Sequence, residues 1–126
     1  MFRLKRNKSS QADVQQARQD KQIIFYNRTA GCPYSTIAKI VLEKEGLSFR
    51  EIMIDLDRRA GRQVEKWTGY RVVPTLVIAK KNGLQPLEPP APLAEGKSPR
   101  GVNRGTLISE PNQRQLRKWL KDNGLR

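Results

Sequence analysis

The chain has 126 residues, a formal net charge of +13, a single cysteine and no histidine. This length supports one domain with one core, and no apolar run approaches the ~20 residues of a membrane-spanning helix. A single cysteine excludes an intramolecular disulfide and suits a reducing compartment, so we expect a cytoplasmic protein with no membrane partner. The lack of histidine excludes a cysteine–histidine catalytic pair and disfavours a zinc site built from protein ligands alone.

Residues 1–21 are interpreted as a basic N-terminal extension. Met1 to Ser10 is polar and basic, which favours a solvated tail over a targeting arm. Ser10 to Asp13 fits a capping box, and this predicts a short helix that ends at about Asp20. The folded domain is then expected over residues 22–126.

Strand and helix patterns alternate in the first half of this domain. Ile23 to Tyr26 is a short apolar run typical of a strand. Ser35 to Glu45 has helical periodicity, and we expect Ile37, Ile40 and Val41 on its buried face. A glycine follows this helix pattern as a natural stop.

The same alternation continues toward the middle of the chain. Phe49 to Asp55 is predicted to be a second strand, Arg58 to Trp67 a basic helix, and Pro74 to Ala79 a third strand. The first two strands and the helix between them form a βαβ unit, which implies a parallel strand pair and a right-handed connection.

The C-terminal part contains a long irregular segment and one clear helix. Five prolines between Leu84 and Arg100 predict an extended surface loop within residues 81–104, with a lid or a partner-docking segment as alternatives. Pro111 to Asn123 is predicted to be a helix, and its apolar stripe consists of Leu116, Trp119 and Leu120.

Cys32 lies between the first strand pattern and the first helix pattern. Pro33 suits the first position of a helix, and a thiol at that place faces unpaired backbone N–H groups and the positive end of the helix dipole. Both favour the thiolate, which is the reactive form of cysteine. On position alone, this interpretation stands about level with that of a small buried packing residue.

Two segments resemble the glutaredoxin family. Gly31-Cys32-Pro33-Tyr34-Ser35 resembles its CPYC/CPYS motif, and residues 68–74 (Thr-Gly-Tyr-Arg-Val-Val-Pro) resemble its TG-x-x-T-V-P segment. The resemblance covers about Gln22 to Ala79, while Gly105 to Glu110 resembles more loosely the fourth strand and following turn of the glutathione transferase N-terminal domain. It implies an α/β thioredoxin-like (glutaredoxin) fold: a four-stranded mixed sheet flanked by helices, with the long proline-rich insertion before the last strand.

The resemblance also assigns roles to the residues at the centre of the motifs. Cys32 would be the nucleophile that attacks a protein–glutathione mixed disulfide. Ser35 would donate a hydrogen bond to its thiolate from the first helical turn. Pro74 is expected to follow a cis peptide bond, and the backbone of Val73 would pair with glutathione.

Further residues would line the glutathione site. Pro33 and Tyr34 accompany the cysteine, and Tyr34 would form one wall. Arg28 and Arg71 are candidates for binding the glycine carboxylate. A final pair, Ser109 and Glu110, stands at the turn that binds the glutamyl end in the resembling families.

Three departures from the family pattern bear on mechanism. Ser35 replaces the second cysteine, so a Cys32–glutathione adduct would have to be cleared by a second glutathione, which is the monothiol route. The glycine pair that usually follows the fourth strand is absent. Arg28 stands four residues before the cysteine instead of three.

We therefore expect a glutathione-dependent thiol–disulfide oxidoreductase with glutathione as cosubstrate and with glutathionylated or disulfide-bonded proteins as partners. One alternative is a thioredoxin-like module that carries a glutathione-ligated iron–sulfur cluster or docks a partner. Another is a glutathione-transferase-like domain. The net positive charge would attract anions, including nucleic acid without sequence preference.

Overall fold

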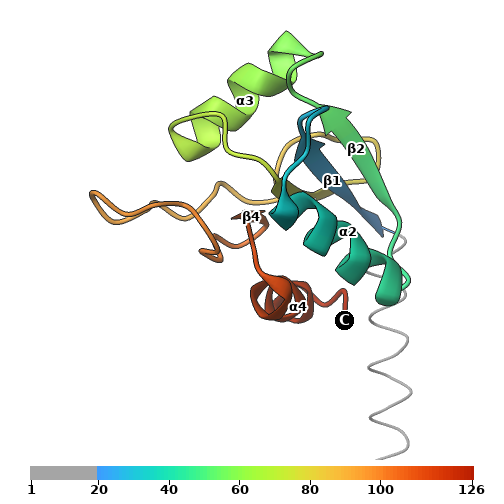
Figure 1. Ribbon diagram of the computed structural model, residues 1–126. Coiled ribbons are helices and arrows are strands. Elements are labelled where there is room, and N and C mark those ends of the chain that lie inside the picture. The colour runs from blue at the N-terminus through green and yellow to red at the C-terminus, as the bar shows by residue number, and fades with distance from the viewer. Residues whose placement is uncertain (1–19) are drawn as a thin grey trace, which may run out of the picture.

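A four-stranded mixed sheet forms the centre of this computed structural model, which describes residues 20–126 (Figure 1). The strand order is β2-β1-β3-β4. Along the chain, the elements are β1 (Lys21–Asn27), α2 (Pro33–Lys44), β2 (Phe49–Met53), α3 (Arg58–Thr68), β3 (Thr75–Lys80), β4 (Leu107–Ser109) and α4 (Gln113–Asp122). The helix predicted between Ser10 and Asp20 and nearly all of the N-terminal extension lie outside the described residues.

Strand pairing confirms the thioredoxin-like α/β fold expected from the sequence. β1 pairs in parallel with β2, with Ile23 opposite Phe49, and α2 makes the connection between them. β3 runs antiparallel to both β1 and β4. The carboxyl end of β1 and the amino end of β3 therefore lie side by side at one end of the sheet. The candidate site lies at this end.

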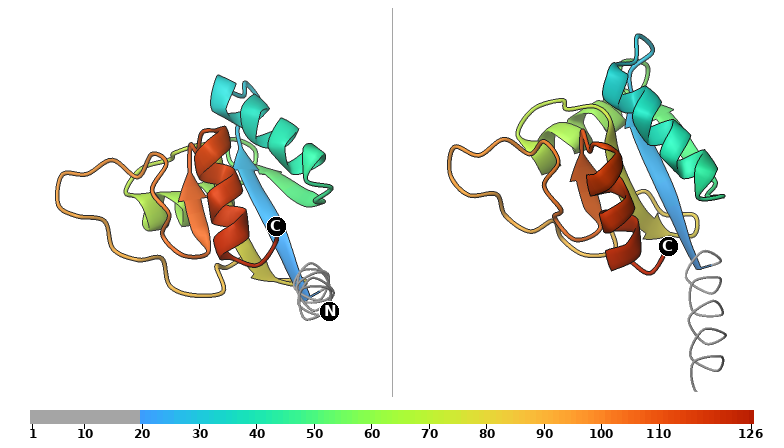
Figure 2. Two further views of the ribbon diagram at one scale, coloured as in Figure 1. Left: turned by 90° about the horizontal axis from the view of Figure 1, so that it is seen from below. Right: turned by 60° about the horizontal axis from the view of Figure 1, so that its bottom comes forward.

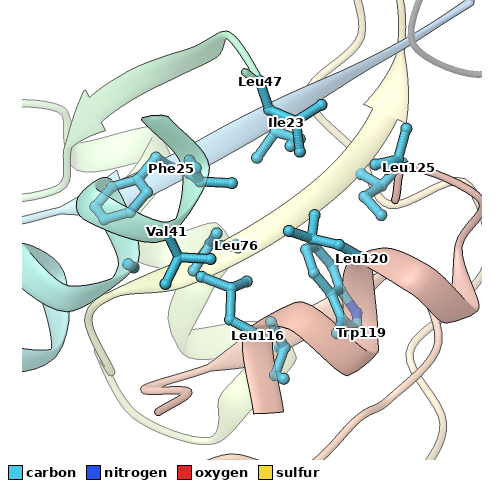
Figure 3. Packing of buried hydrophobic residues seen from close by; sticks show 13 residues of the cluster. Ile23, Phe25, Val41, Leu47, Leu76, Leu116, Trp119, Leu120 and Leu125 are labelled. Atoms are coloured by element: carbon cyan, nitrogen blue, oxygen red, sulfur yellow. The ribbon is translucent and has the colours of Figure 1, made fainter. Parts of the chain in front are cut away.

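The core has two layers because side chains alternate across β1 and β3. One face of the sheet packs against α2 and α4 through Ile23, Phe25, Leu76, Ile78, Ile108, Leu116, Trp119 and Leu120 (Figure 3). The other face packs against α3 through Ile24, Tyr26, Val64, Val77, Ala79 and Leu107.

Burial raises the pKa of the Tyr26 phenol to about 12. Arg50 lowers this pKa and Asp57 raises it, and both effects are smaller than that of burial. The Tyr26 hydroxyl donates a hydrogen bond to the Leu84 carbonyl at 3.0 Å.

The buried face of α2 differs from the predicted one. Ile37 and Ile40 are 37% and 46% exposed, whereas Ala38, Val41 and Leu42 are buried. The buried arc is centred on Ala38, and Ile37 lies about 100° around the helix from it. A small residue at the centre lets the helix approach the sheet closely, so the prediction failed by giving weight to the largest apolar side chains.

The apolar stripe predicted for α4 is confirmed, since Leu116, Trp119 and Leu120 are all fully buried. A capping box between Asn112 and Gln115 begins the helix. The indole Nε1 of Trp119 donates a hydrogen bond to a backbone carbonyl at 2.8 Å, which satisfies its buried N–H group.

Residues 81–104 form the predicted irregular loop, which projects from the β4 edge (Figure 2). Its end is fastened by Arg104, which is 7% exposed. The Arg104 guanidinium donates to the carbonyls of Ala91 (2.8 Å) and Trp67 (2.6 Å), and burial lowers its pKa. No helix among the described residues has the length and apolar character to cross a membrane.

Candidate active site

A short turn after β1 delivers the chain to Cys32. The N–H of Gly31 donates to the carbonyl of Arg28 at 2.9 Å, and Gly31 has a φ of 69°, which other residues adopt only with strain. Thr29 ties this turn to the segment after β2, because its N–H donates to Asp55 Oδ1 at 3.2 Å. Hydrogen bonding from the Thr29 hydroxyl holds the pKa of Asp55 below its usual value.

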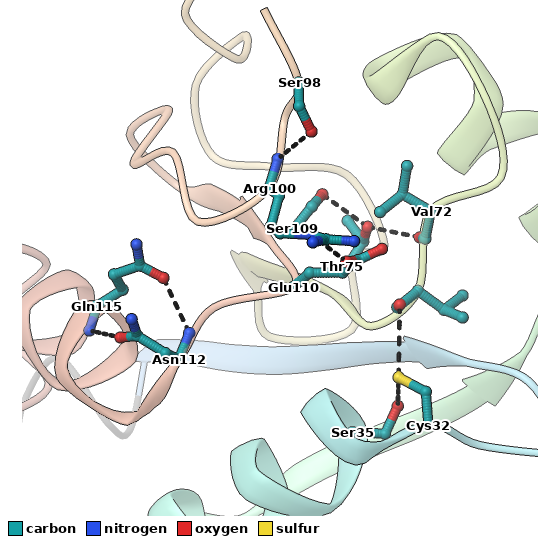
Figure 4. Close-up of polar contacts among 11 residues, drawn as sticks. Cys32, Ser35, Val72, Thr75, Ser98, Arg100, Ser109, Glu110, Asn112 and Gln115 are labelled. Carbon is teal, nitrogen blue, oxygen red and sulfur yellow. Dashed lines mark hydrogen bonds and ion pairs between the residues drawn. The ribbon is translucent and has the colours of Figure 1, made fainter.

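Cys32 is the N-cap residue of α2, and Pro33 takes the first helical position (Figure 4). The thiol is free and half-buried. Its Sγ lies 3.3 Å from Ser35 Oγ and 3.8 Å from the Val73 carbonyl oxygen. The predicted place of Cys32 at the start of a helix is therefore confirmed.

A chain of polar contacts runs from Cys32 into the protein. Ser35 Oγ donates to Asn27 Oδ1 at 2.8 Å, and Asn27 Nδ2 donates to Glu51 Oε2 at 3.0 Å. Lys39 Nζ lies 2.7 Å from the same carboxylate oxygen. Burial alone would raise the pKa of Glu51, but the hydrogen bonds from Asn27 and Lys39 lower it.

This network gives the Ser35 hydroxyl two polar neighbours. A serine hydroxyl has one proton, and Ser35 Oγ donates to Asn27 Oδ1. Between Ser35 Oγ and Cys32 Sγ either atom can be the donor, so donation from Ser35 to the Cys32 thiolate stays a prediction. Both Ser35 and Asn27 are only 3% exposed, so neither finds a substitute partner in water.

The loop before β3 faces Cys32. The Val73–Pro74 peptide bond is cis, as expected from the sequence. The Thr75 hydroxyl donates to the Val72 carbonyl at 2.8 Å, and the N–H of Glu110 donates to the Pro74 carbonyl at 2.8 Å. These contacts fix the approach of this loop to the cysteine.

An open pocket of about 460 Å³ surrounds the thiol. Its lining contains seven of the predicted site residues: Arg28, Cys32, Pro33, Tyr34, Arg71, Val73 and Glu110. It also contains Gly31, Tyr70 and Val72, which lie in the two motifs but were not predicted as site residues, and Arg100, which lies outside both motifs. Three predicted residues, Ser35, Pro74 and Ser109, do not line it. Ser109 is fully buried, and its Oγ lies 2.8 Å from Thr75 Oγ1. Its side chain therefore contacts the neighbouring strand β3 and not the pocket.

Arginines stand on two sides of this pocket. Arg28 Nη2 donates to the Arg71 carbonyl at 2.5 Å, and Arg71 Nε lies 3.3 Å from Glu65 Oε2. Arg100 comes from the insertion, where no motif marked it, and its Nε donates to Glu110 at 2.7 Å. The lining thus contains three arginines and one carboxylate, and its formal charge is positive.

The rest of the described surface offers no comparable constellation. A larger open cavity of about 750 Å³ runs along α4, lined by Asn112, Gln113, Arg114, Arg117, Lys118, Lys121 and Arg126. It contains no nucleophile and could only bind anions by charge. Within residues 20–126, no three Cys, His, Asp or Glu side chains are grouped to hold a metal ion.

Comparison with known proteins points to one family. The glutaredoxin family model matches residues 23–82, a segment that includes the Cys32 motif and the cis Val73–Pro74 bond. A crystal structure of a buckwheat glutaredoxin–glutathione complex is similar at 21% sequence identity and a TM-score of 0.38, over 55% of this chain and 67% of that chain. No curated protein matches the chain.

Proposed function

We propose that this chain, whose residues 23–82 match the glutaredoxin family model, is a glutathione-dependent thiol–disulfide oxidoreductase of the monothiol type. The observation that carries the proposal is the open, positively charged pocket that contains Cys32 with Val73 beside it. The substrates would be mixed disulfides between glutathione and protein thiols, and glutathione would be the cosubstrate.

The reaction needs two exchange steps. In the first, the Cys32 thiolate attacks the glutathione sulfur of the mixed disulfide, the existing S–S bond breaks, and the protein substrate leaves as a thiolate that takes a proton from water. In the second, the thiolate of another glutathione attacks the glutathione sulfur held on Cys32. Oxidised glutathione leaves, and the Cys32 thiolate is restored.

Residues around the thiol would hold the tripeptide. The backbone of Val73 would pair with the extended peptide. Val73 directly precedes the cis bond to Pro74. Tyr34 and Pro33 line the pocket and would form its apolar wall. Arg28 and Arg71 both line the pocket, and Arg28 Nη2 donates to the main-chain carbonyl of Arg71, which supports a role for this pair in binding one carboxylate.

Ser35 closes the dithiol route. It occupies the position from which a second cysteine would displace glutathione, and its hydroxyl cannot do so. Because Ser35 Oγ lies 3.3 Å from Cys32 Sγ, a cysteine at this position would be near enough for a disulfide after a small rotation. The matched variant Ser35→Cys is therefore an informative test of mechanism.

Intact-mass spectrometry tests the proposal directly. With oxidised glutathione, the protein should gain one glutathione on Cys32, and reduced glutathione should remove it. The adduct should persist in the isolated protein, whereas in Ser35→Cys the glutathione should be expelled as a disulfide closes between Cys32 and the introduced thiol. The Cys32→Ala variant should gain nothing.

Failure of the wild-type protein to take up glutathione at any ratio of oxidised to reduced glutathione would end the oxidoreductase proposal. The domain would then be better described as a thioredoxin-like module that docks a partner.

A further inference from the structure

The insertion, residues 81–104, contributes one side chain to the Cys32 pocket. That side chain is Arg100, which lines the pocket together with Tyr34 and Glu110. Most of the insertion projects away from the sheet (Figure 2). We therefore ask which part of the ligand Arg100 would bind.

The backbone around Arg100 is held against β4. Arg100 forms an isolated bridge with Ser109, and the N–H of Gly101 donates to the Ser109 carbonyl at 2.7 Å. Gly101 has a φ of 69°, and a Cβ there would collide with the side chain of Gln115 in the α4 capping box. The Arg100 N–H also donates to Ser98 Oγ at 3.2 Å. The position of Arg100 is therefore fixed by the fold.

The guanidinium is oriented with one edge still open. Its Nε donates to Glu110 Oε2 at 2.7 Å (Figure 4). Its central carbon lies 5.4 Å from the centre of the Tyr34 ring. Within residues 20–126 the guanidinium makes no other hydrogen bond, and the side chain is 61% exposed. Since a guanidinium has five N–H donors in a planar fork, the terminal nitrogens can still bind a carboxylate in bidentate fashion.

Glu110 orients the Arg100 guanidinium through this hydrogen bond. Its φ of 43° lies in the left-handed region, which a glutamate adopts at a cost, and its N–H is bonded to the Pro74 carbonyl. The turn thus aims the Glu110 carboxylate at Arg100 from the end of β4. Pairing with Glu110 raises the pKa of Arg100, which is charged throughout the working range.

The pocket arginines come from different strands of the sheet. Arg28 follows β1 and Arg71 precedes β3, whereas Arg100 lies beside β4. A tripeptide extended along Val73 spans about 10 Å between its ends. Its two termini would then reach the two groups of arginines.

We propose that Arg100 is a substrate-binding residue that recognises the α-carboxylate of the γ-glutamyl end of glutathione. This inference rests on the proposed function and makes the insertion part of the specificity site. The ligand class is a thiol with a carboxylate at each end, of which Arg28 and Arg71 take one and Arg100 takes the other.

Two mixed disulfides on one reporter peptide test the assignment. One contains glutathione, and the other contains 4-aminobutyryl-cysteinylglycine, which lacks only the glutamyl α-carboxylate. The wild-type protein should show a KM about two- to fivefold lower for the glutathione disulfide, the range expected for a charge pair at an exposed site. Arg100→Gln should abolish this difference, and Arg100→Lys should restore part of it.

Lys97→Gln is the matched control, because it removes one exposed positive charge from the same insertion outside the pocket. It should leave the preference unchanged. Equal KM values for the two disulfides with the wild-type protein would overturn the inference, as would an equal rise for both in Arg100→Gln. Equal KM values in the wild-type protein would overturn the inference without any variant, so this outcome can be read even if a variant folds poorly.

Failure of the proposed function would look different. A protein that turned over neither disulfide and formed no Cys32–glutathione adduct would end both proposals. A protein that exchanged both disulfides at equal rates would keep the function and lose only the role of Arg100.

Discussion

At the scale of single residues, Ser35 does more than replace a second thiol. Its hydroxyl joins the Cys32 sulfur to the buried amide of Asn27, and Asn27 is held in turn by Glu51. Because each group in this chain has its hydrogen-bond role fixed by the next, the orientation of the reactive thiol depends on residues that never meet the substrate.

Removing the Ser35 hydroxyl should therefore cost stability. Ser35→Ala leaves Asn27 Oδ1 buried without a donor, and we expect the free energy of unfolding to fall by about 1–3 kcal/mol. Urea denaturation measures this change. Thr36→Ala, which removes an exposed hydroxyl from the next residue of α2, should change it by less than about 0.5 kcal/mol. Equal effects of the two substitutions would contradict the buried network.

Glu51 should make this network sensitive to acid. Its pKa is lower in the folded protein than the usual glutamate value of about 4.3, because Asn27 and Lys39 favour the charged form. A lowered folded-state pKa gives stability that is present above the unfolded-state value and is lost as pH falls through the folded-state value. The free energy of unfolding should therefore decrease as pH falls below about 4.3, and Glu51→Gln should flatten this part of the profile. Glu95→Gln, at an exposed position of the insertion, should leave the profile unaltered.

At the scale of elements, a few hydrogen bonds near its start and its end hold the insertion to the rest of the domain. The N–H of Leu87 donates to the Ile78 carbonyl at 3.0 Å near its start, and Arg104 bonds to Ala91 and Trp67 near its end. Arg104 thereby links the loop to the end of α3. Since the guanidinium is nearly buried, those two carbonyls rely on it for hydrogen bonding.

Arg104→Met should release the loop while keeping an apolar side chain of similar length. Loss of two charge-assisted hydrogen bonds should lower the free energy of unfolding by about 2–4 kcal/mol. Limited trypsin digestion should also cut faster after Lys97, because the loop opens locally more often. Unchanged cleavage at Lys97 would show that Arg104 does not hold the loop. Arg59→Met, on an exposed position of α3, provides the control.

At the scale of the whole molecule, the net charge of +13 is the dominant property. Part of this charge lies around the Cys32 pocket, which contains Arg28, Arg71 and Arg100, and part lies on the α4 surface with its five basic side chains, Arg114, Arg117, Lys118, Lys121 and Arg126. Such a field attracts anionic substrates and raises their local concentration. The sequence pairs this charge with no recognisable nucleic-acid-binding motif.

Nucleic-acid binding should consequently be weak, independent of sequence and strongly dependent on salt. Counterion release makes the logarithm of the affinity fall linearly with the logarithm of salt concentration. Fluorescence anisotropy with two unrelated DNA duplexes at several salt concentrations measures both properties. Salt-resistant binding that distinguishes the duplexes would refute this expectation.

The sequence by itself determined the order of strands and helices, the place of Cys32 at a helix start, and the buried stripe of α4. These features depend on local periodicity, turn residues and motif spacing, which a single segment carries in full. The residue patterns predicted the βαβ unit, and the resemblance of the two motifs to the glutaredoxin family implied the rest of the fold.

Only the tertiary structure decided the buried face of α2, the hydrogen bond from Ser35 to Asn27 and the presence of Arg100 in the pocket. Each depends on a partner distant in sequence: the sheet beneath Ala38, the amide of Asn27, and Glu110 at the end of β4. An insertion without regular structure has no periodicity from which the position of one arginine could be predicted. Its place beside Tyr34 follows from hydrogen bonds to β4 that form only when the chain is folded.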